Sequence, residues 1–152
     1  MKFFNIFFRW LDSLGRSATR NNAPYYRAKI MTDNELDFHQ TLKFACARSS
    51  YEIWPQVAML ALLQPRKDPK VTRDWAALNA ISNRRVDWVI ARDGEPLVVI
   101  ELDDRTHNAA ADRVRDDILT SCGYQVARFD SRKKPDAQQL RKEIDGLANT
   151  RR

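Results

Sequence analysis

Apolar positions along the chain recur with two spacings, and the change from one to the other predicts the order of its helices and strands. Spacings of three and four residues are typical of an amphipathic helix, whereas short alternating or continuous apolar runs are typical of a strand. Helices are predicted over residues 32–47, 72–81, 109–122 and 136–148. Strands are predicted over residues 51–57, 86–91, 97–102 and 124–129. The main elements therefore follow the order helix, three strands, helix, strand, helix.

Capping and breaking residues support several of these boundaries. Thr32 suits the start of the first helix, and Thr72 can cap the short second helix. Pro55 indicates an edge strand or a bulge, and residues 58–71 are expected to form a loop after a short apolar turn. The apolar side of the first helix is assigned to Leu36, Leu42, Phe44 and Ala45.

The residues between the strands predict how the strands pair. Strands 86–91 and 97–102 are joined by a turn containing Asp93-Gly94, which favours an antiparallel hairpin. Strands 97–102 and 124–129 are joined by a helix, so they should be parallel neighbours with a right-handed crossover. The predicted fold class is α/β, with a mixed central sheet flanked by helices.

The composition suits one globular core. The chain has 152 residues, 43% hydrophobic content, four glycines and six prolines, which excludes a disordered chain and disfavours two separate cores. We expect an apolar and basic segment with a linker over residues 1–30, and a single domain over residues 31–152. Cys46 and Cys122 have no metal-binding or redox spacing, so we expect reduced, buried thiols in a cytoplasmic protein.

Residues 1–14 are rich in aromatic and aliphatic side chains, with basic residues among them. Arg9 interrupts the run and no small-residue cleavage site follows, so the segment is a poor signal peptide. It is also too short to span a bilayer. Two interpretations stay open: an amphipathic helix lying peripherally at the inner membrane, or a surface that packs on the domain or on a partner protein.

The net charge of +6 is unevenly distributed. Residues 1–30 carry six bases and one acid, residues 31–127 twelve bases and fifteen acids, and residues 128–152 eight bases and four acids, giving +5, −3 and +4. Basic ends around an acidic middle indicate a polyanion partner such as nucleic acid, although solvated charged faces give the same pattern. The candidate phosphate contacts are Arg66, Lys67, Lys70, Arg73, Arg113, Arg115, Arg132, Lys133 and Lys134.

Three acids are predicted to converge at one end of the hairpin. If the hairpin is symmetric about Gly94, residues whose numbers sum to 188 face each other, which places Asp87 opposite Glu101. Asp103 projects from the same face as Glu101 if the strand stays regular. Opposed like charges destabilise a sheet, and a hard divalent ion such as Mg²⁺ or Mn²⁺ prefers carboxylate ligands. The alternative is that solvated acids pair with Arg84, Arg85 or Arg105.

These acids belong to a longer ordered pattern over about residues 32–132. Its pieces are Glu35, Pro55-Gln56-Val57, Val86-Asp87-Trp88-Val89, Val99-Ile100-Glu101-Leu102-Asp103-Asp104, His107, Asp112, Arg115, Asp116, Gly123-Tyr124 and Arg128-Phe129. The pattern resembles the PD-(D/E)xK nuclease superfamily, and most closely a bacterial domain of unknown function, DUF2726, with its Vsr-like and DUF559 relatives.

The resemblance implies a restriction-endonuclease-like αβββαβ core and Mg²⁺-dependent hydrolysis of phosphodiester bonds, with DNA favoured over RNA. It implies that the metal ligands are Asp87, Glu101 and Asp103, and that Gln56 and Glu35 complete the outer shell of the metal. An acid that favours the helix dipole is an equal interpretation of Glu35. Arg113 and Arg115 face the substrate phosphate or pair with neighbouring acids of their helix.

One position departs from the superfamily pattern. The usual lysine, two residues after the second acid, is Asp103 here. His107 either takes over as a general base or phosphate contact, or makes a local hydrogen bond at the start of a helix. Two functions therefore stay open: a metal-dependent endonuclease, and an inactive nucleic-acid-binding module on the same fold, with residues 1–14 as a membrane tether.

Overall fold

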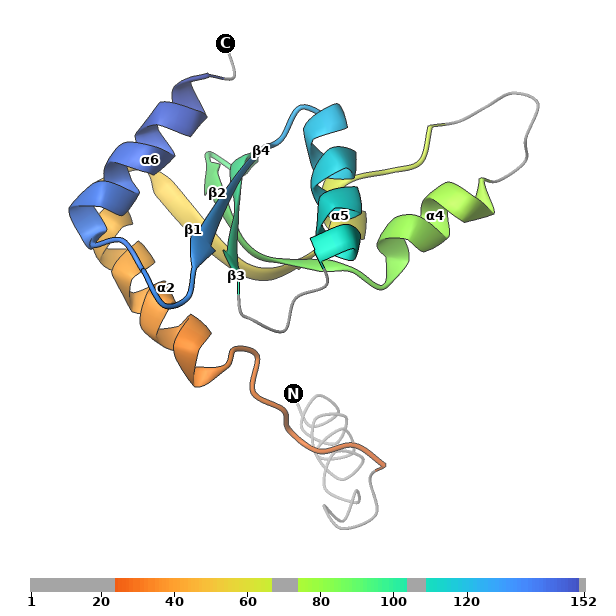
Figure 1. The fold of residues 1–152 in the computed structure, drawn as a ribbon, viewed down its shortest axis with the longest axis horizontal. Helices are drawn as coiled ribbons and strands as arrows, with labels where there is room; N and C mark the ends of the chain where they lie inside the picture. The colour runs from red at the N-terminus through yellow and green to blue at the C-terminus, as the bar shows by residue number, and fades with distance from the viewer. Residues whose placement is uncertain (1–23, 67–73, 104–108, 151–152) are drawn as a thin grey trace, which may run out of the picture. The chain divides into compact units, whose positions relative to one another are not determined.

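The centre of the molecule is a four-stranded mixed sheet (Figure 1). The computed structural model describes residues 24–66, 74–103 and 109–150, and gives only the backbone of residues 109–112. The chain divides into two compact units, Met1–Ile30 and Met31–Arg152, and the sheet belongs to the second.

The strands lie in the order of the sequence. They are β1 (Tyr51–Ala58), β2 (Arg85–Arg92), β3 (Glu95–Asp103) and β4 (Gln125–Asp130). The pairs β1–β2 and β2–β3 are antiparallel, and β4 runs parallel to β3. The predicted hairpin and the predicted parallel pair are therefore confirmed, as is the edge position of the strand containing Pro55.

The turn of the hairpin consists of two residues, Asp93 and Gly94, and is therefore not symmetric about Gly94. Asp93 and Gly94 both have positive φ, 53° and 78°, as a two-residue turn requires, and Arg92 pairs with Glu95. The numbers of paired residues sum to 187 beside the turn, so the predicted register is wrong there. A bulge between Ile90 and Ala91 restores the predicted sum of 188 from Ile90 onward. The prediction therefore holds at the end of the hairpin that carries the acids.

Helices cover both faces of the sheet (Figure 1). α2 (Asp33–Cys46) and α6 (Ala137–Asn149) pack together on one face, and their contacts with the sheet form the larger core. The other face carries α3 (Met59–Leu62), α4 (Trp75–Ser82) and α5 (Ala109–Ser121). The first core is built mainly from Phe38, Leu42, Trp88, Ile90, Ile100, Leu140 and Ile144, and the second from Met59, Ile81, Val89, Val99 and Leu119.

Two helix starts are explained by side-chain caps. Thr32 and Glu35 form a capping box at α2, in which the Glu35 carboxylate accepts a hydrogen bond from the Thr32 amide at 2.5 Å. The short helix α4 is capped by Asp74, whose carboxylate accepts from the Ala77 amide. Thr72, the predicted cap, lies outside the described residues.

Three other details differ from the sequence analysis. Residues Met59–Leu62, predicted to be a turn and loop, form a helical turn. Leu42 and Ala45 of the predicted apolar side are buried, but Leu36 and Phe44 are 47% and 73% exposed, because the buried stripe of α2 continues through Phe38 and Cys46. Cys46 is buried as expected, but Cys122 is exposed because it follows the last turn of α5.

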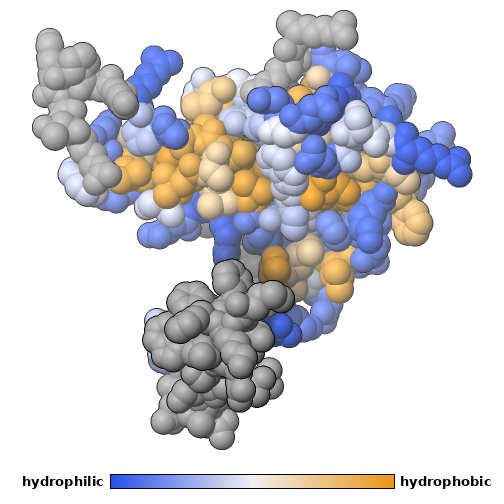
Figure 2. Space-filling view, turned by 180° about the vertical axis from the view of Figure 1, so that it is seen from behind, coloured by the Kyte–Doolittle hydropathy of each residue, from blue (hydrophilic) through white to orange (hydrophobic). Residues whose placement is uncertain are grey.

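Apolar side chains also remain at the surface of several helices. Figure 2 shows an extended hydrophobic area on one face of the molecule, bordered by hydrophilic residues. Trp75 of α4 and Leu60 of α3 are 58% and 40% exposed. Within the described residues, each helix is too short or too polar to cross a membrane. Residues 1–14 and their proposed membrane or protein contact lie outside the described residues.

Candidate functional site

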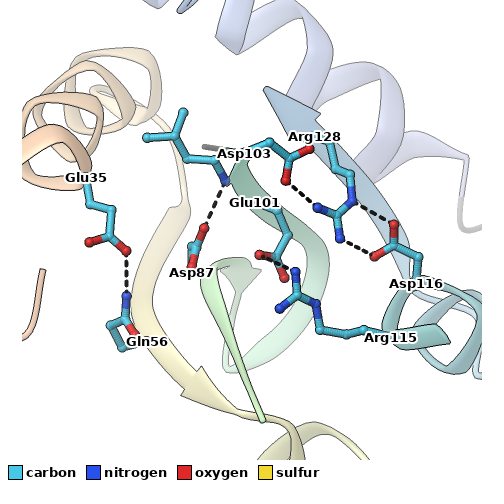
Figure 3. A network of polar contacts seen from close by, with 9 residues as sticks. Glu35, Gln56, Asp87, Glu101, Asp103, Arg115, Asp116 and Arg128 are labelled. Atoms are coloured by element: carbon cyan, nitrogen blue, oxygen red, sulfur yellow. Dashed lines mark hydrogen bonds and ion pairs between the residues drawn. The ribbon is translucent and has the colours of Figure 1, made fainter. Parts of the chain in front are cut away.

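Four polar residues form a row across the sheet, one from each strand. The pairs Pro55–Trp88 and Val57–Val86 flank Gln56 and Asp87, so these two residues occupy the same level of β1 and β2. Continuing the register of Trp88 with Ile100 brings Asp87 beside Glu101, and Glu101 is paired with Arg128 of β4. The row lies at the carboxyl end of β3. Helices contribute further side chains to the site around it (Figure 3).

Asp87 marks the point where β2 and β3 stop pairing through their backbones. Its Oδ2 accepts a hydrogen bond from the amide of Leu102 at 2.9 Å, so the side chain takes the place of a backbone acceptor. Burial raises the pKa of Asp87, and the nearby charge of Glu35 raises it further, while the Leu102 amide opposes both. The fold therefore fixes the Asp87 carboxyl group in a position that disfavours its charge.

Glu101 is the most deeply buried acid among the described residues, with only 2% of its surface exposed. Its Oε2 lies 3.1 Å from Nη2 of Arg115, which projects from α5. Its Oε1 is buried and has no hydrogen-bond partner in the described part of the chain. Burial, followed by the charge of Asp87, raises the pKa of Glu101 to about 8 despite the opposing charge of Arg115. A buried carboxylate oxygen without a partner is costly unless something else binds it.

Asp103 makes different contacts from those of Asp87 and Glu101. Its carboxylate pairs with Nη1 of Arg128, and its side chain is 37% exposed. Arg128 is also held by Asp116 of α5 through two contacts of 2.7 Å, in a bidentate arrangement. Hydrogen bonding to Asp116 raises the pKa of Arg128, which stays charged throughout the accessible pH range. Asp103 is thus fixed at the edge of the site by an arginine.

Glu35 and Gln56 close the side of the site opposite to Arg115 (Figure 3). The amide of Gln56 donates to Oε1 of Glu35 at 3.0 Å, while Oε2 of Glu35 caps its own helix. Gln56 has a φ of 52°, a backbone conformation that a non-glycine residue rarely adopts and that is common near functional sites. The predicted outer-shell residues therefore lie at the level of Asp87 and contact each other.

The described side chains of this network carry an excess of negative charge. Five carboxylates, those of Glu35, Asp87, Glu101, Asp103 and Asp116, are accompanied by the two guanidinium groups of Arg115 and Arg128. Their formal charge is −3 when all are ionised. A cation that reached Asp87 and Glu101 would relieve this excess, and carboxylate oxygens are the ligands that Mg²⁺ and Mn²⁺ prefer.

The predicted set of three metal ligands is only partly assembled. Asp87 and Glu101 lie together, whereas Asp103 is turned to Arg128. No group of three or more Asp, Glu, His or Cys side chains is arranged to hold a metal among the residues whose side chains the structure describes. His107, a further predicted site residue, lies outside the described residues.

The predicted phosphate contacts are spread over the surface. Arg66 and Arg113 are exposed, and the half-buried Arg115 forms an ion pair with Glu101. Arg132 pairs with Asp130, and Lys134 pairs with Asp37 at 2.8 Å. Lys133 is exposed. Lys67, Lys70 and Arg73 lie outside the described residues.

Arg128 and Asp116 were not assigned to the site from the sequence. Both stand in the ordered pattern of residues found in the sequence, and the parallel pairing of β4, which carries Arg128, with β3 was predicted. The pairing register of Glu101 with Arg128 was the missing piece, because a helical crossover leaves the register of parallel strands undetermined. Glu101 pairs with Arg115 and Asp103 with Arg128; Arg105, one of the partners considered in the alternative interpretation, lies outside the described residues.

Comparison with known protein families assigns the chain to one of them. Residues 27–147 match the family described as "Protein of unknown function (DUF2726)", and the chain belongs to this family. Searches of curated proteins and of solved structures found no match.

Proposed function

We propose that this domain is a divalent-metal-dependent nuclease of the PD-(D/E)xK type, acting on phosphodiester bonds of nucleic acid and on DNA in preference to RNA. The element order and the mixed sheet agree with a restriction-endonuclease-like core. The acids Asp87 and Glu101 stand at the corresponding places of that pattern. The proposal assigns them the role of metal ligands.

One observation carries the proposal: the half-buried Asp87 and the buried Glu101 lie side by side, and the ion pair with Arg115 leaves them with an excess negative charge when both are ionised. The pKa of both is raised, and Oε1 of Glu101 has no hydrogen-bond partner in the described part of the chain. Strongly perturbed acids of this kind are concentrated at functional sites. A purely structural role would be served better by apolar residues or by a complete ion pair.

The donor set fits a hard divalent cation. Asp87, Glu101 and the carbonyl oxygen of Leu102 would supply oxygen ligands, and Glu35 with Gln56 would orient the surroundings of Asp87. When bound, Mg²⁺ or Mn²⁺ supplies Lewis acidity, which polarises the phosphate and lowers the pKa of a coordinated water.

The other side chains have separate tasks in hydrolysis. Asp103, held at the edge of the site by Arg128, orients the attacking water and accepts its hydrogen bond. The oxygen of that water bonds to phosphorus while its proton passes to the Asp103 carboxylate, and the phosphorus–oxygen bond to one sugar breaks, the leaving oxygen taking a proton from solvent. Arg115 is near enough to the buried acids to contact a phosphate oxygen. The basic residues outside the site bind further phosphates without reading sequence.

A second candidate is a nucleic-acid-binding module without catalysis. It is favoured by Asp103, which replaces the usual lysine of the superfamily and is already paired with Arg128. On this alternative the basic surface binds nucleic acid, but no bond is cut. The two candidates share the fold and differ in whether Asp87 and Glu101 are needed.

Cleavage of supercoiled plasmid DNA, and of RNA, in Mg²⁺ or Mn²⁺ separates the candidates. The wild type should nick DNA, whereas Asp87→Asn and Glu101→Gln should not. Asp117→Asn is the matched control, since it makes the same change at an exposed acid of α5. Binding without cleavage by the wild type in both ions would establish the second candidate, and cleavage that survives Asp87→Asn would contradict the assigned site.

A further inference from the structure

Arg115 and Arg128 both face the acids of the site, but their surroundings differ. Arg128 is held by the Asp116 carboxylate through two of its nitrogens and by Asp103 through a third. Arg115 approaches the acid pair from α5, with Nη2 at 3.1 Å from Oε2 of Glu101, and its side chain is 15% exposed. Arg128 is thus fixed by a strong fork, while Arg115 neutralises a residue that the proposed function assigns to the metal.

A guanidinium and a divalent cation compete for the same carboxylate. Arginine keeps its charge at every pH a folded protein experiences, so Arg115 cannot give up a proton when a cation arrives. Positive charges a few ångströms apart repel strongly in a partly buried site. The guanidinium must therefore move away from Glu101, or the cation is bound weakly.

We propose that Arg115 is an internal counter-ion of the Asp87–Glu101 pair, which a divalent cation displaces, and that the released guanidinium then contacts a phosphate oxygen of the nucleic acid. This inference rests on the proposed function and adds the order in which the cation and the phosphate replace the contact between Arg115 and Glu101. The phosphate binds the guanidinium that the metal has displaced. Metal and nucleic acid therefore bind with positive coupling, and each raises the affinity of the protein for the other.

The first test is calorimetric titration with Mn²⁺ in the absence of nucleic acid. Arg115→Met removes the competing charge and keeps much of the side-chain volume, so its affinity for Mn²⁺ should exceed that of the wild type by on the order of ten-fold. Arg113→Met is the control, because it removes the same charge from an exposed position of the same helix. Its Mn²⁺ affinity should stay close to that of the wild type.

Each result has a distinct meaning. An affinity in Arg115→Met equal to that of the wild type, or weaker, would overturn the counter-ion role while leaving the metal site of the proposed function intact. An equal gain in Arg113→Met would overturn it as well, since general charge would then explain the effect. A wild type and an Arg115→Met protein that both fail to bind Mn²⁺ would overturn the proposed function together with this inference.

A second measurement needs no variant and covers the case in which Arg115→Met does not fold. Arginine side-chain Nε–H signals of the wild-type protein can be followed by NMR during a titration with Mg²⁺. The Arg115 signal should shift and exchange faster with solvent as the guanidinium leaves Glu101, whereas the Arg128 signal should stay unchanged. An Arg115 signal that does not respond while Mg²⁺ binds would contradict the exchange.

Discussion

Two charged networks lie at opposite ends of the β1–β2 strand pair, and they shift the pKa values of their acids in opposite directions. At the turn end, Tyr51 donates a hydrogen bond to Asp145 at 2.8 Å, and Arg141 donates to the same carboxylate at 2.7 Å. The guanidinium groups of Arg92 and Arg141 lie 4.8 and 5.3 Å from the centre of the Tyr51 ring. One acid is thus surrounded by two bases and a hydroxyl donor.

The pKa values of the acids record this difference. Burial acts to raise the pKa of Asp145, but hydrogen bonds from Arg141 and Tyr51 outweigh it and leave the pKa lowered. At the other end, burial dominates and the pKa values of Asp87 and Glu101 are raised. The fold can therefore satisfy a carboxylate when the residue is structural. The unsatisfied pair at the site end is best explained by a ligand that completes it.

The largest expected difference between the networks is in catalysis. Asp87→Asn should reduce DNA cleavage in Mg²⁺ by about three orders of magnitude or more, as expected when a metal ligand is lost from an electrostatically organised site. Asp145→Asn makes the same change in the structural network and should leave cleavage unchanged below its melting temperature. Initial rates of plasmid nicking measure both effects, and similar losses in the two variants would remove the distinction.

The pH dependence of stability should have opposite signs in the two networks. The pKa of Glu101 in the folded protein is raised from 4.5 to about 8. Its contribution to stability is therefore fully present below pH 4.5 and is lost as the pH rises through 8. Without metal, the free energy of unfolding of the wild type should fall relative to Glu101→Gln over this range, by on the order of a few kcal/mol.

Asp145 gives the reverse slope. Its pKa is lowered, so its contribution is present above the ordinary value of 3.8 and is lost as the pH falls through the folded pKa. The free energy of unfolding of the wild type should exceed that of Asp145→Asn, and this difference should disappear only in acid. Urea denaturation of the three proteins at a series of pH values measures these differences. If the difference in free energy of unfolding between the wild type and Glu101→Gln did not change with pH, the pKa of Glu101 would not be raised in the folded protein.

Single amide substitutions above about pH 8, where Glu101 is ionised, give a smaller contrast. Asp145→Asn weakens hydrogen bonds from Arg141 and Tyr51 and should lower stability by about 1 kcal/mol. Asp87→Asn relieves repulsion with Glu101 and keeps an oxygen that can accept from the Leu102 amide, so it should raise metal-free stability by a similar amount. Thermal melting without metal measures both, and destabilisation by Asp87→Asn would show that its charge is structural.

The smallest expected effect concerns the basic surface away from both networks. Replacing Arg132, Lys133 and Lys134 by Gln should flatten the dependence of nucleic-acid affinity on salt, because fewer counterions are released. The slope of log affinity against log salt concentration should change by less than about three, since Arg132 and Lys134 already pair with acids. Binding titrations at several salt concentrations measure it, and binding that ignores salt would argue against contacts with phosphates.

Local patterns in the sequence were enough to predict the sheet and the meeting of the two buried acids. The Asp93-Gly94 turn predicts the hairpin, and the helix between β3 and β4 predicts their parallel pairing. The facing of Asp87 and Glu101 follows from the register, although a bulge near the turn was needed to restore the expected pairing. Strand periodicity is a short-range property, so it is readable from the sequence.

Contacts made by long side chains across elements could not be predicted in the same way. The contact of Arg115 with Glu101 depends on the rotation of α5 about its axis, and that of Arg128 with Asp103 depends on the register of β4. The positive φ of Gln56 gives no signal in its residue type, since φ above zero is usual only for glycine. These features arise from packing between distant segments.

Thermal melting with and without Mn²⁺ measures whether Asp87 and Glu101 bind a divalent cation. A ligand that binds only the folded state stabilises it by mass action. At about one hundred times its Kd, Mn²⁺ should stabilise the wild type by about 2.7 kcal/mol. For a domain of this size that is a rise in Tm of several degrees, at about 2–4 °C per kcal/mol. Above about pH 8, where Glu101 is ionised, Asp87→Asn should melt higher than the wild type without metal, and it should not respond to Mn²⁺. A wild type whose Tm does not change with Mn²⁺, together with an Asp87→Asn protein that melts lower, would show that the two acids bind no cation and that the charge of Asp87 is structural.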